Sequence, residues 1–159
     1  MADTNNLFPD AYENEETVAD EIVSSERVGY RPGIAFNYTT GDFIRDGRNR
    51  LLESTGVESW QQWCVNCIQT ERYKHLAYNS DFGLDLDAVF AAASRAEAES
   101  ILTREINDAI MADPYERTAY IDSIQYSWQS PDSVIVTATI VGIDDTTIDI
   151  TANVTQEES

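Results

Sequence analysis

Two cysteines and one histidine are the residues of this sequence whose types could support metal binding or nucleophilic chemistry. Cys64 and Cys67 have the C-x-x-C spacing of redox pairs and of half a zinc site, and His75 is the only histidine. A redox pair needs a helix N-terminus to lower the thiol pKa, and a zinc site needs four ligands. Both cysteines fall on an apolar stripe, and His75 brings the ligand count only to three. We interpret them as small core residues and predict no metal and no cofactor.

The acidic residues do not indicate an active site either. The chain has 29 of them, so almost any fold brings two within reach. A glycosidase needs one carboxyl group in an apolar cleft that faces a second one at a set distance. Only Glu71 and Glu105 have partly apolar surroundings in the sequence, and we place both on solvated helix faces. The sequence also lacks a G-x-S-x-G elbow, a Walker loop and a Gly-rich dinucleotide turn, so we predict no catalytic residue.

The stretch TERYKHLAY, residues 70–78, collects much of the scarce positive charge. It contains Arg72 and the only lysine, Lys74, with Tyr73 and Tyr78 beside them. Two readings are compatible. Cations placed just after a helix stabilise the negative end of the helix dipole, and Arg72 could bond the last helical carbonyls. The same cluster could also clamp an acidic segment of a partner.

The composition is that of a folded and strongly acidic chain. It has 159 residues, 42% of them apolar, which suits one domain with a sizeable core. The net charge of −19 argues against binding to nucleic acid or to an anionic membrane, because both attract Lys and Arg. No apolar run approaches the roughly 18 to 20 residues of a membrane span. The first residues lack the basic and apolar regions of a signal peptide, so we expect none.

Residues 1–29 differ from the rest of the chain. From Met1 to Glu26 there are eight acidic residues and no basic one, with few apolar side chains. Such a segment buries too little surface to order itself. We therefore expect an acidic extension that is ordered by a partner, a folded domain at residues 30–155 and a polar tail at 156–159.

The first half of the domain predicts a hairpin followed by helices. Turn residues at 41–42 and 46–47 interrupt strand-like runs in residues 34–52. Capping residues and an apolar repeat of helical period then predict helices at 55–70, at a short segment from Asp85 or Asp87, and at 94–113. The first helix should bury Trp60, Trp63, Cys64, Cys67 and Ile68.

The last third of the sequence changes to a period of two. Three runs rich in β-branched and aromatic residues lie at 120–128, 133–141 and 147–154, separated by turn stretches. The last run should pack one face and expose the other, with Ile148, Ile150, Ala152 and Val154 inward and Asp149, Thr151 and Asn153 outward. We predict an α+β fold: an early β-hairpin, two main helices plus a short one, and a C-terminal three-stranded antiparallel meander packed against the helices.

The order of these elements and one motif resemble a known family. The run Thr70-Glu71-Arg72-Tyr73, followed by Tyr78 and by Phe82-Gly83, is similar to the helix exit of baseplate wedge proteins from contractile phage tails. This is the sheath-initiator family, historically labelled baseplate lysozyme-like. The resemblance covers roughly Phe36 to Val154. Family members also carry a Glu-Pro-Arg motif after the long helix, and residues 113–117 (Asp-Pro-Tyr-Glu-Arg) contain its acid, proline and arginine spread by an insertion.

The resemblance implies a structural protein rather than an enzyme. It would sit in six copies around the tail tube, contact wedge proteins and tube or hub proteins, and offer the first ring of the tail sheath protein a surface like that of a sheath subunit. The implied location is the baseplate of a virion tail or injection system, after synthesis in the host cytoplasm. The alternatives are another tail connector or completion protein, and a cell-wall glycosidase. A glycosidase would turn over peptidoglycan and lose that activity on a single Asp or Glu substitution.

We expect three parts of the chain to bind partners. The helix exit and the diverged motif contribute Arg72, Tyr73, Lys74, Tyr78, Glu116 and Arg117. The third part is the last strand, Ile148 to Val154, which in a sequential meander is an edge with unpaired backbone groups. In the resembling family, extended arms of sheath subunits join such a sheet. Strand addition would therefore use this edge or the early hairpin around Phe36 to Phe43.

The charge balance yields a first prediction. One lysine, nine arginines and 29 acidic residues resemble the surfaces of halophile proteins, in which high salt screens self-repulsion. We expect substantial unfolding when the protein is dialysed from molar salt to about 0.1 M, and circular dichroism measures this unfolding. Indifference to that change would remove the halophile hypothesis.

Overall fold

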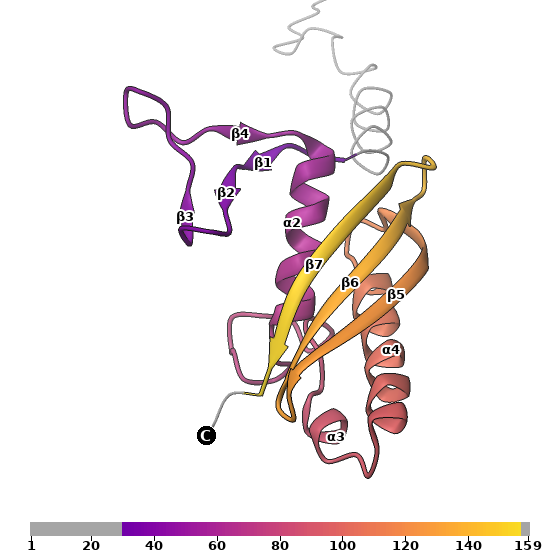
Figure 1. Cartoon of the computed structure of the whole chain (residues 1–159). Coiled ribbons are helices and arrows are strands. Elements are labelled where there is room, and N and C mark those ends of the chain that lie inside the picture. Colours follow the sequence, from indigo (N-terminus) through magenta and orange to yellow (C-terminus); the bar gives the residue numbers. More distant parts are fainter. Residues whose placement is uncertain (1–29, 157–159) are drawn as a thin grey trace, which may run out of the picture.

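The computed structural model describes residues 30–156, which form three helices and seven strands. The acidic extension predicted at 1–29 and most of the polar tail lie outside the described residues. The elements in chain order are β1 (Gly33–Ile34), β2 (Phe36–Asn37), β3 (Asp42–Phe43), β4 (Glu53–Ser54), α2 (Gly56–Gln69), α3 (Asp87–Phe90), α4 (Arg95–Met111), β5 (Thr118–Ser130), β6 (Ser133–Gly142) and β7 (Thr147–Thr155). The predicted α+β fold is confirmed (Figure 1).

The helices begin at the predicted caps. At α2 the Thr55 hydroxyl accepts from Glu58 N, and the Glu58 carboxylate accepts from Thr55 N at 2.7 Å, which completes a reciprocal capping box. At α4 the Ser94 hydroxyl accepts from Glu97 N, but the Glu97 carboxylate bonds Ala93 N instead of the cap residue. In the described part of the chain, no helix is long and apolar enough to cross a membrane.

The C-terminal strands form one antiparallel sheet in the order β5-β6-β7, as predicted. Strand β6 buries Val134, Val136, Ala138 and Ile140 along one face. The β5–β6 pairing shifts register three times, whereas the β6–β7 pairing runs unbroken from Thr147 to Thr155. One β5 shift lies between Ile121 and Ser123, and it lets Ile121 and Ile124 both pack against the core in spite of their odd spacing.

Helices α2 and α4 cover one face of the sheet, with α2 against β7 and α4 against β5 (Figure 1). The core between these layers is apolar and includes the buried Trp60, Cys64, Cys67, Ile68, Leu102, Ile106, Ile140 and Ile150. One member of the predicted stripe differs: Trp63 is only half-buried, because it lies where α2 faces a surface hollow.

Residues 33–54 form an arm that stands beside α2 (Figure 1). The pairs β1–β4 and β2–β3 are both antiparallel, so the predicted hairpin is in fact two small nested pairs. Several large apolar side chains of the arm are exposed: Ile34, Tyr38, Phe43, Ile44, Leu51 and Leu52. The side-chain amide of Gln62 makes two hydrogen bonds to the arm. Its nitrogen donates to Ile34 O (3.1 Å), and its oxygen accepts from Phe36 N (3.0 Å). This side chain therefore ties the arm to α2.

A buried ion pair turns the chain from α4 into β5. The Arg117 guanidinium donates to both carboxylate oxygens of Asp113, at 2.7 and 3.0 Å, and Asp113 also accepts from the Arg117 backbone N–H. Both side chains are almost fully buried. The same guanidinium lies 5.6 Å from the Trp63 ring centroid on α2, and Ile143 N donates to Arg117 O. We refer to this arrangement as the Asp113–Arg117 corner.

Replacing Arg117 with methionine should cost about 3–5 kcal/mol of unfolding free energy, because it leaves the Asp113 carboxylate buried without its partner. Chemical denaturation measures this change. Arg50→Met is the matched control, because Arg50 pairs with Asp46 at the same i, i+4 spacing but with 70% of its side chain exposed, so its loss should change little. Equal denaturation midpoints for the two variants would show that the corner contributes no more than a surface pair.

Candidate functional site

Strand β7 is an edge of the sheet, as the sequential meander required. Its side chains alternate strictly, with Ile148, Ile150, Ala152 and Val154 buried and Asp149, Thr151 and Asn153 exposed. The inward residues pack in the core and the outward ones are polar. Contact with a partner that adds to this edge would therefore depend on the backbone and on the outward side chains.

Hydrogen bonds around β7 identify which backbone groups face the open edge. Gly142 N donates to Thr146 O, and Gln156 N donates to Asp132 O, so residues at even positions point toward β6 and its turns. Asp149 O instead accepts from Gln61 Nε2 of α2 at 2.9 Å. Because alternate residues of a strand point to opposite sides, Asp149, Thr151 and Asn153 present their N–H and C=O groups outward.

A groove of about 400 Å³ runs along this edge. One wall is β7 at residues 149–151, the next is the outer face of α2, and the third is the arm. The residues that line it are Ala35, Phe36, Tyr38, Ile44, Ser54, Glu58, Gln61, Gln62, Val65, Gln69, Asp149, Ile150 and Thr151. The early hairpin and the last strand, which the sequence offered as alternative docking edges, thus border a single groove.

The carboxylates of this groove have structural partners. Glu58 accepts from the backbone of the α2 cap, and Asp149 Oδ1 accepts from Thr139 Oγ1 at 2.7 Å across the β6–β7 pair. These bonds hold the two side chains in place at the rim. The two carboxylates give the groove negative charge, and their hydrogen bonds fix where that charge lies.

The basic stretch after α2 lies on a loop that is clasped at its base. Arg72 N donates to Leu84 O, and Leu84 N donates to Thr70 O. Gly83 has a φ of +92°, and a Cβ there would lie 2.6 Å from Thr70 O, so the glycine of the motif is required for this close approach. The predicted bond from Arg72 to the helix end is wrong: its Nε donates to Gly83 O at 3.0 Å, across the loop base.

The positive charges of this loop meet carboxylates within the domain. Arg72 lies 3.4 Å from Glu105 of α4, and Lys74 Nζ lies 2.9 Å from Glu71 Oε2. Glu71 and Glu105 are both buried, so their predicted place on solvated helix faces is wrong. The pairing of Glu105 could not be seen in the sequence, because Arg72 reaches it only when the loop folds against α4. Tyr73 and Tyr78 are exposed.

The diverged motif divides between the interior and the surface. Arg117 is buried in the Asp113–Arg117 corner, whereas Glu116 is exposed and has a left-handed backbone with a φ of +50°. Within the described residues the two do not pair with each other. Binding of partners by the helix exit and by this motif stays a prediction.

The cysteines lie in the core, as predicted. Burial raises the pKa of Cys67 to about 11 and raises that of Cys64 further. Cys67 Sγ lies 3.8 Å from Ala109 O. In residues 30–156 no group of three or more His, Cys, Asp or Glu side chains could hold a metal ion. His75 stacks edge-on against Tyr78, with ring centroids 5.9 Å apart.

Comparison with family models gives a match over residues 33–145 to the contractile injection system sheath initiators. The matched region includes the arm, α2, the clasped loop, α4 and the Asp113–Arg117 corner. The chain belongs to the sheath-initiator family. It is therefore a component of the baseplate of a contractile tail or injection system, and the family's role is structural.

A solved structure shares the fold of this sheath initiator. A Geobacter sulfurreducens protein, provisionally described as a tail lysozyme, superposes with a TM-score of 0.55 over 69% of this chain and 99% of its own. The two are 17% identical in sequence, so the likeness concerns the fold alone. A search of curated proteins finds no match.

The buried thiols lead to a prediction about reactivity. Because burial keeps Cys64 and Cys67 protonated well above their ordinary pKa, we expect the native protein at pH 8 to resist a thiol reagent such as dithionitrobenzoate. The same protein in denaturant should release colour equal to two thiols per chain. Rapid labelling of the native state would place a thiolate at the surface and reopen the redox reading of the C-x-x-C pair.

Proposed function

We propose that this sheath initiator starts sheath assembly by accepting an extended segment of a sheath subunit along the open edge of β7. The proposal rests on the backbone N–H and C=O groups of Asp149, Thr151 and Asn153, which point away from β6 and lie beside a groove. An added strand would satisfy these groups by backbone hydrogen bonds. It would also continue the three-stranded sheet without disturbing the β6–β7 ladder.

The groove determines which strand fits. An incoming strand places alternate side chains on opposite faces of the extended sheet. One set would lie over α2 and the arm, near Phe36, Tyr38 and Val65, and should be apolar. The other set would lie beside Asp149, Thr151 and Asn153, and should be polar or basic. The alternating pattern of the guest segment gives the register, and the apolar positions give much of the affinity.

The remaining partners follow from the family. In this proposal six copies surround the tail tube, and the exposed apolar residues of the arm contact wedge, tube or hub proteins. Exposed apolar side chains that gather on one projecting segment are typical of protein interfaces. The helix exit, with Tyr73 and Tyr78 exposed, and Glu116 beyond the corner form a second contact region. No step in this function needs a cofactor or a catalytic residue.

Thr151→Pro tests the proposed edge. It removes one outward N–H that has no ladder partner, so the domain should fold with a stability close to that of wild type. Sheath nucleation on purified baseplates, counted by electron microscopy, should fall about tenfold, which is the effect of roughly one lost backbone hydrogen bond together with the ring clash.

Two further variants make this test specific. Thr151→Ala keeps the outward donor and should nucleate sheath as wild type does. Ile150→Pro removes a donor that points to β6 and should destabilise the sheet itself, which thermal unfolding would reveal. If Thr151→Pro folds and seeds sheath as well as Thr151→Ala, then β7 is not the docking edge.

A further inference from the structure

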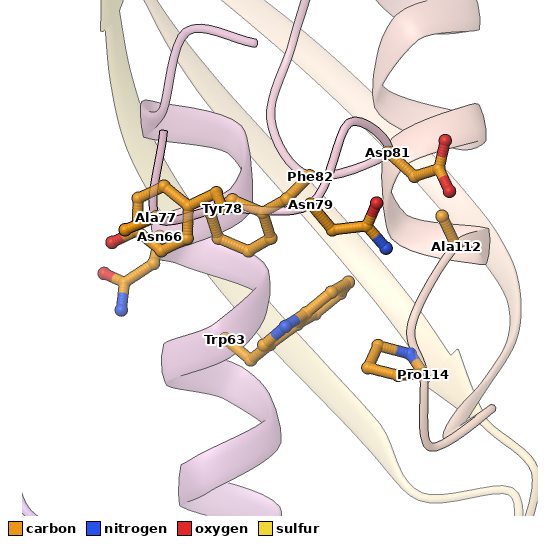
Figure 2. Close-up of a pocket in the computed structure, with 9 residues that line it drawn as sticks. All are labelled: Trp63, Asn66, Ala77, Tyr78, Asn79, Asp81, Phe82, Ala112 and Pro114. Atoms are coloured by element: carbon orange, nitrogen blue, oxygen red, sulfur yellow. The ribbon is translucent and has the colours of Figure 1, made fainter. Parts of the chain in front are cut away.

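A second hollow lies away from the β7 groove, between the clasped loop and the end of α4 (Figure 2). We call it the aromatic pocket. It has a volume of about 300 Å³ and is lined by Trp63, Asn66, Ala77, Tyr78, Asn79, Asp81, Phe82, Ala112 and Pro114. It shares none of these residues with the groove. This volume is at the small end of ligand pockets, and it suits one long side chain rather than a folded partner.

Three aromatic rings form its walls. Phe82 meets Trp63 edge to face, with ring centroids 5.8 Å apart, and Tyr78 stacks on Phe82 at 4.6 Å. Two turns hold the loop in this shape, since Tyr78 N donates to His75 O and Phe82 N donates to Asn79 O. The walls are therefore fixed before a ligand arrives. Aromatic faces carry negative electrostatic potential and attract cations.

The charge at the pocket is also negative. Asp81 lies at its edge, and among residues 30–156 it has neither an ion-pair nor a hydrogen-bond partner. The nearby cations are already paired: Arg72 with Glu105, and Arg117 with Asp113. Asn66 and Asn79 add polar amide side chains to the lining. A cation is therefore the ligand that this combination of aromatic rings, amides and one carboxylate favours.

The same domain already stacks guanidinium groups on aromatic rings. Arg117 lies 5.1 Å from the Tyr115 ring centroid and 5.6 Å from that of Trp63, and Arg95 lies 5.5 Å from that of Trp128. A planar guanidinium can stack on a ring and still donate two parallel bonds to a carboxylate, which an ammonium group cannot do.

We propose that the aromatic pocket binds an arginine side chain presented by a neighbouring protein of the assembly. The guanidinium stacks among Trp63, Tyr78 and Phe82 and donates to the Asp81 carboxylate, while the aliphatic stem packs on Pro114. The site thus recognises a basic partner segment, in contrast to the β7 groove, which takes a strand through its backbone. The strong negative charge of the chain attracts such a segment from a distance.

The test titrates the full chain with the peptide acetyl-Gly-Arg-Gly-amide and monitors binding by NMR. We expect saturable shifts of the Trp63 indole resonance at millimolar peptide. Trp60 and Trp128 serve as internal controls, because their indole N–H groups are bonded to Thr118 and Glu99 within the fold and should not shift. The same peptide with citrulline, the neutral analogue of arginine, should bind at least about threefold more weakly.

Substitutions localise the effect. Asp81→Asn and Tyr78→Ala should each weaken arginine-peptide binding at least about threefold. Tyr120→Ala is the matched control, because Tyr120 is 53% exposed, like Tyr78 at 52%, but lies on β5 outside the pocket. Equal binding of the citrulline peptide would identify an apolar groove instead. Either that result or the absence of a saturable shift up to about 10 mM peptide would overturn the proposal.

Discussion

The buried ion pair between Asp113 and Arg117 sets the relation between the helices and the sheet. It links the end of α4 to the start of β5, and through Arg117 O it also holds the turn that leads into β7. The guanidinium touches Trp63 of α2 as well. A buried pair of this kind adds little net stability over an apolar replacement, but it tolerates the loss of neither partner. Its role is to specify one arrangement of these elements, and both candidate binding surfaces depend on that arrangement.

The clasped loop, which follows the C-terminal end of α2, is also held by contacts between distant segments. Its base is closed by backbone pairing of residues 70–72 with Leu84. Glu105 of α4 accepts from Asp85 N and pairs with Arg72. The motif that resembles the family is therefore a structural clasp. The clasp needs the arginine at position 72 to bond across the loop base, and it needs glycine at position 83 so that this backbone can approach that of Thr70.

Local patterns in the sequence were sufficient for most of the fold. Caps at Thr55 and Ser94, the change from helical to alternating period and the turn residues predicted the helices and the meander, because each signal acts over a few residues. Long-range pairings were not accessible in this way. In the sequence Glu105 is one acidic residue of a predicted helix, and no neighbouring residue indicates that it pairs with Arg72. Likewise, Tyr30 packs on Trp60 and donates to Asp144, 114 residues away. The candidate edge was predictable because alternation and sequential order define it, whereas the groove and the aromatic pocket require distant elements to meet.

The sheet has two edges, and their geometry makes them unequal as templates. Three register shifts along β5 interrupt the regular spacing of the backbone N–H and C=O groups on its outer side. Natural sheets use such irregularities to prevent pairing at an exposed edge. Strand β7 stays in register with β6 over its full length, so its outward groups remain evenly spaced. An open, regular edge invites indiscriminate pairing, yet here Gln61 already occupies the Asp149 carbonyl, and α2 and the arm restrict access from one face. In the proposed function, a guest strand would have to displace or accommodate Gln61 and fit between those walls. On this proposal, selectivity would come from the groove, because the backbone supplies hydrogen bonds that any correctly shaped strand could use.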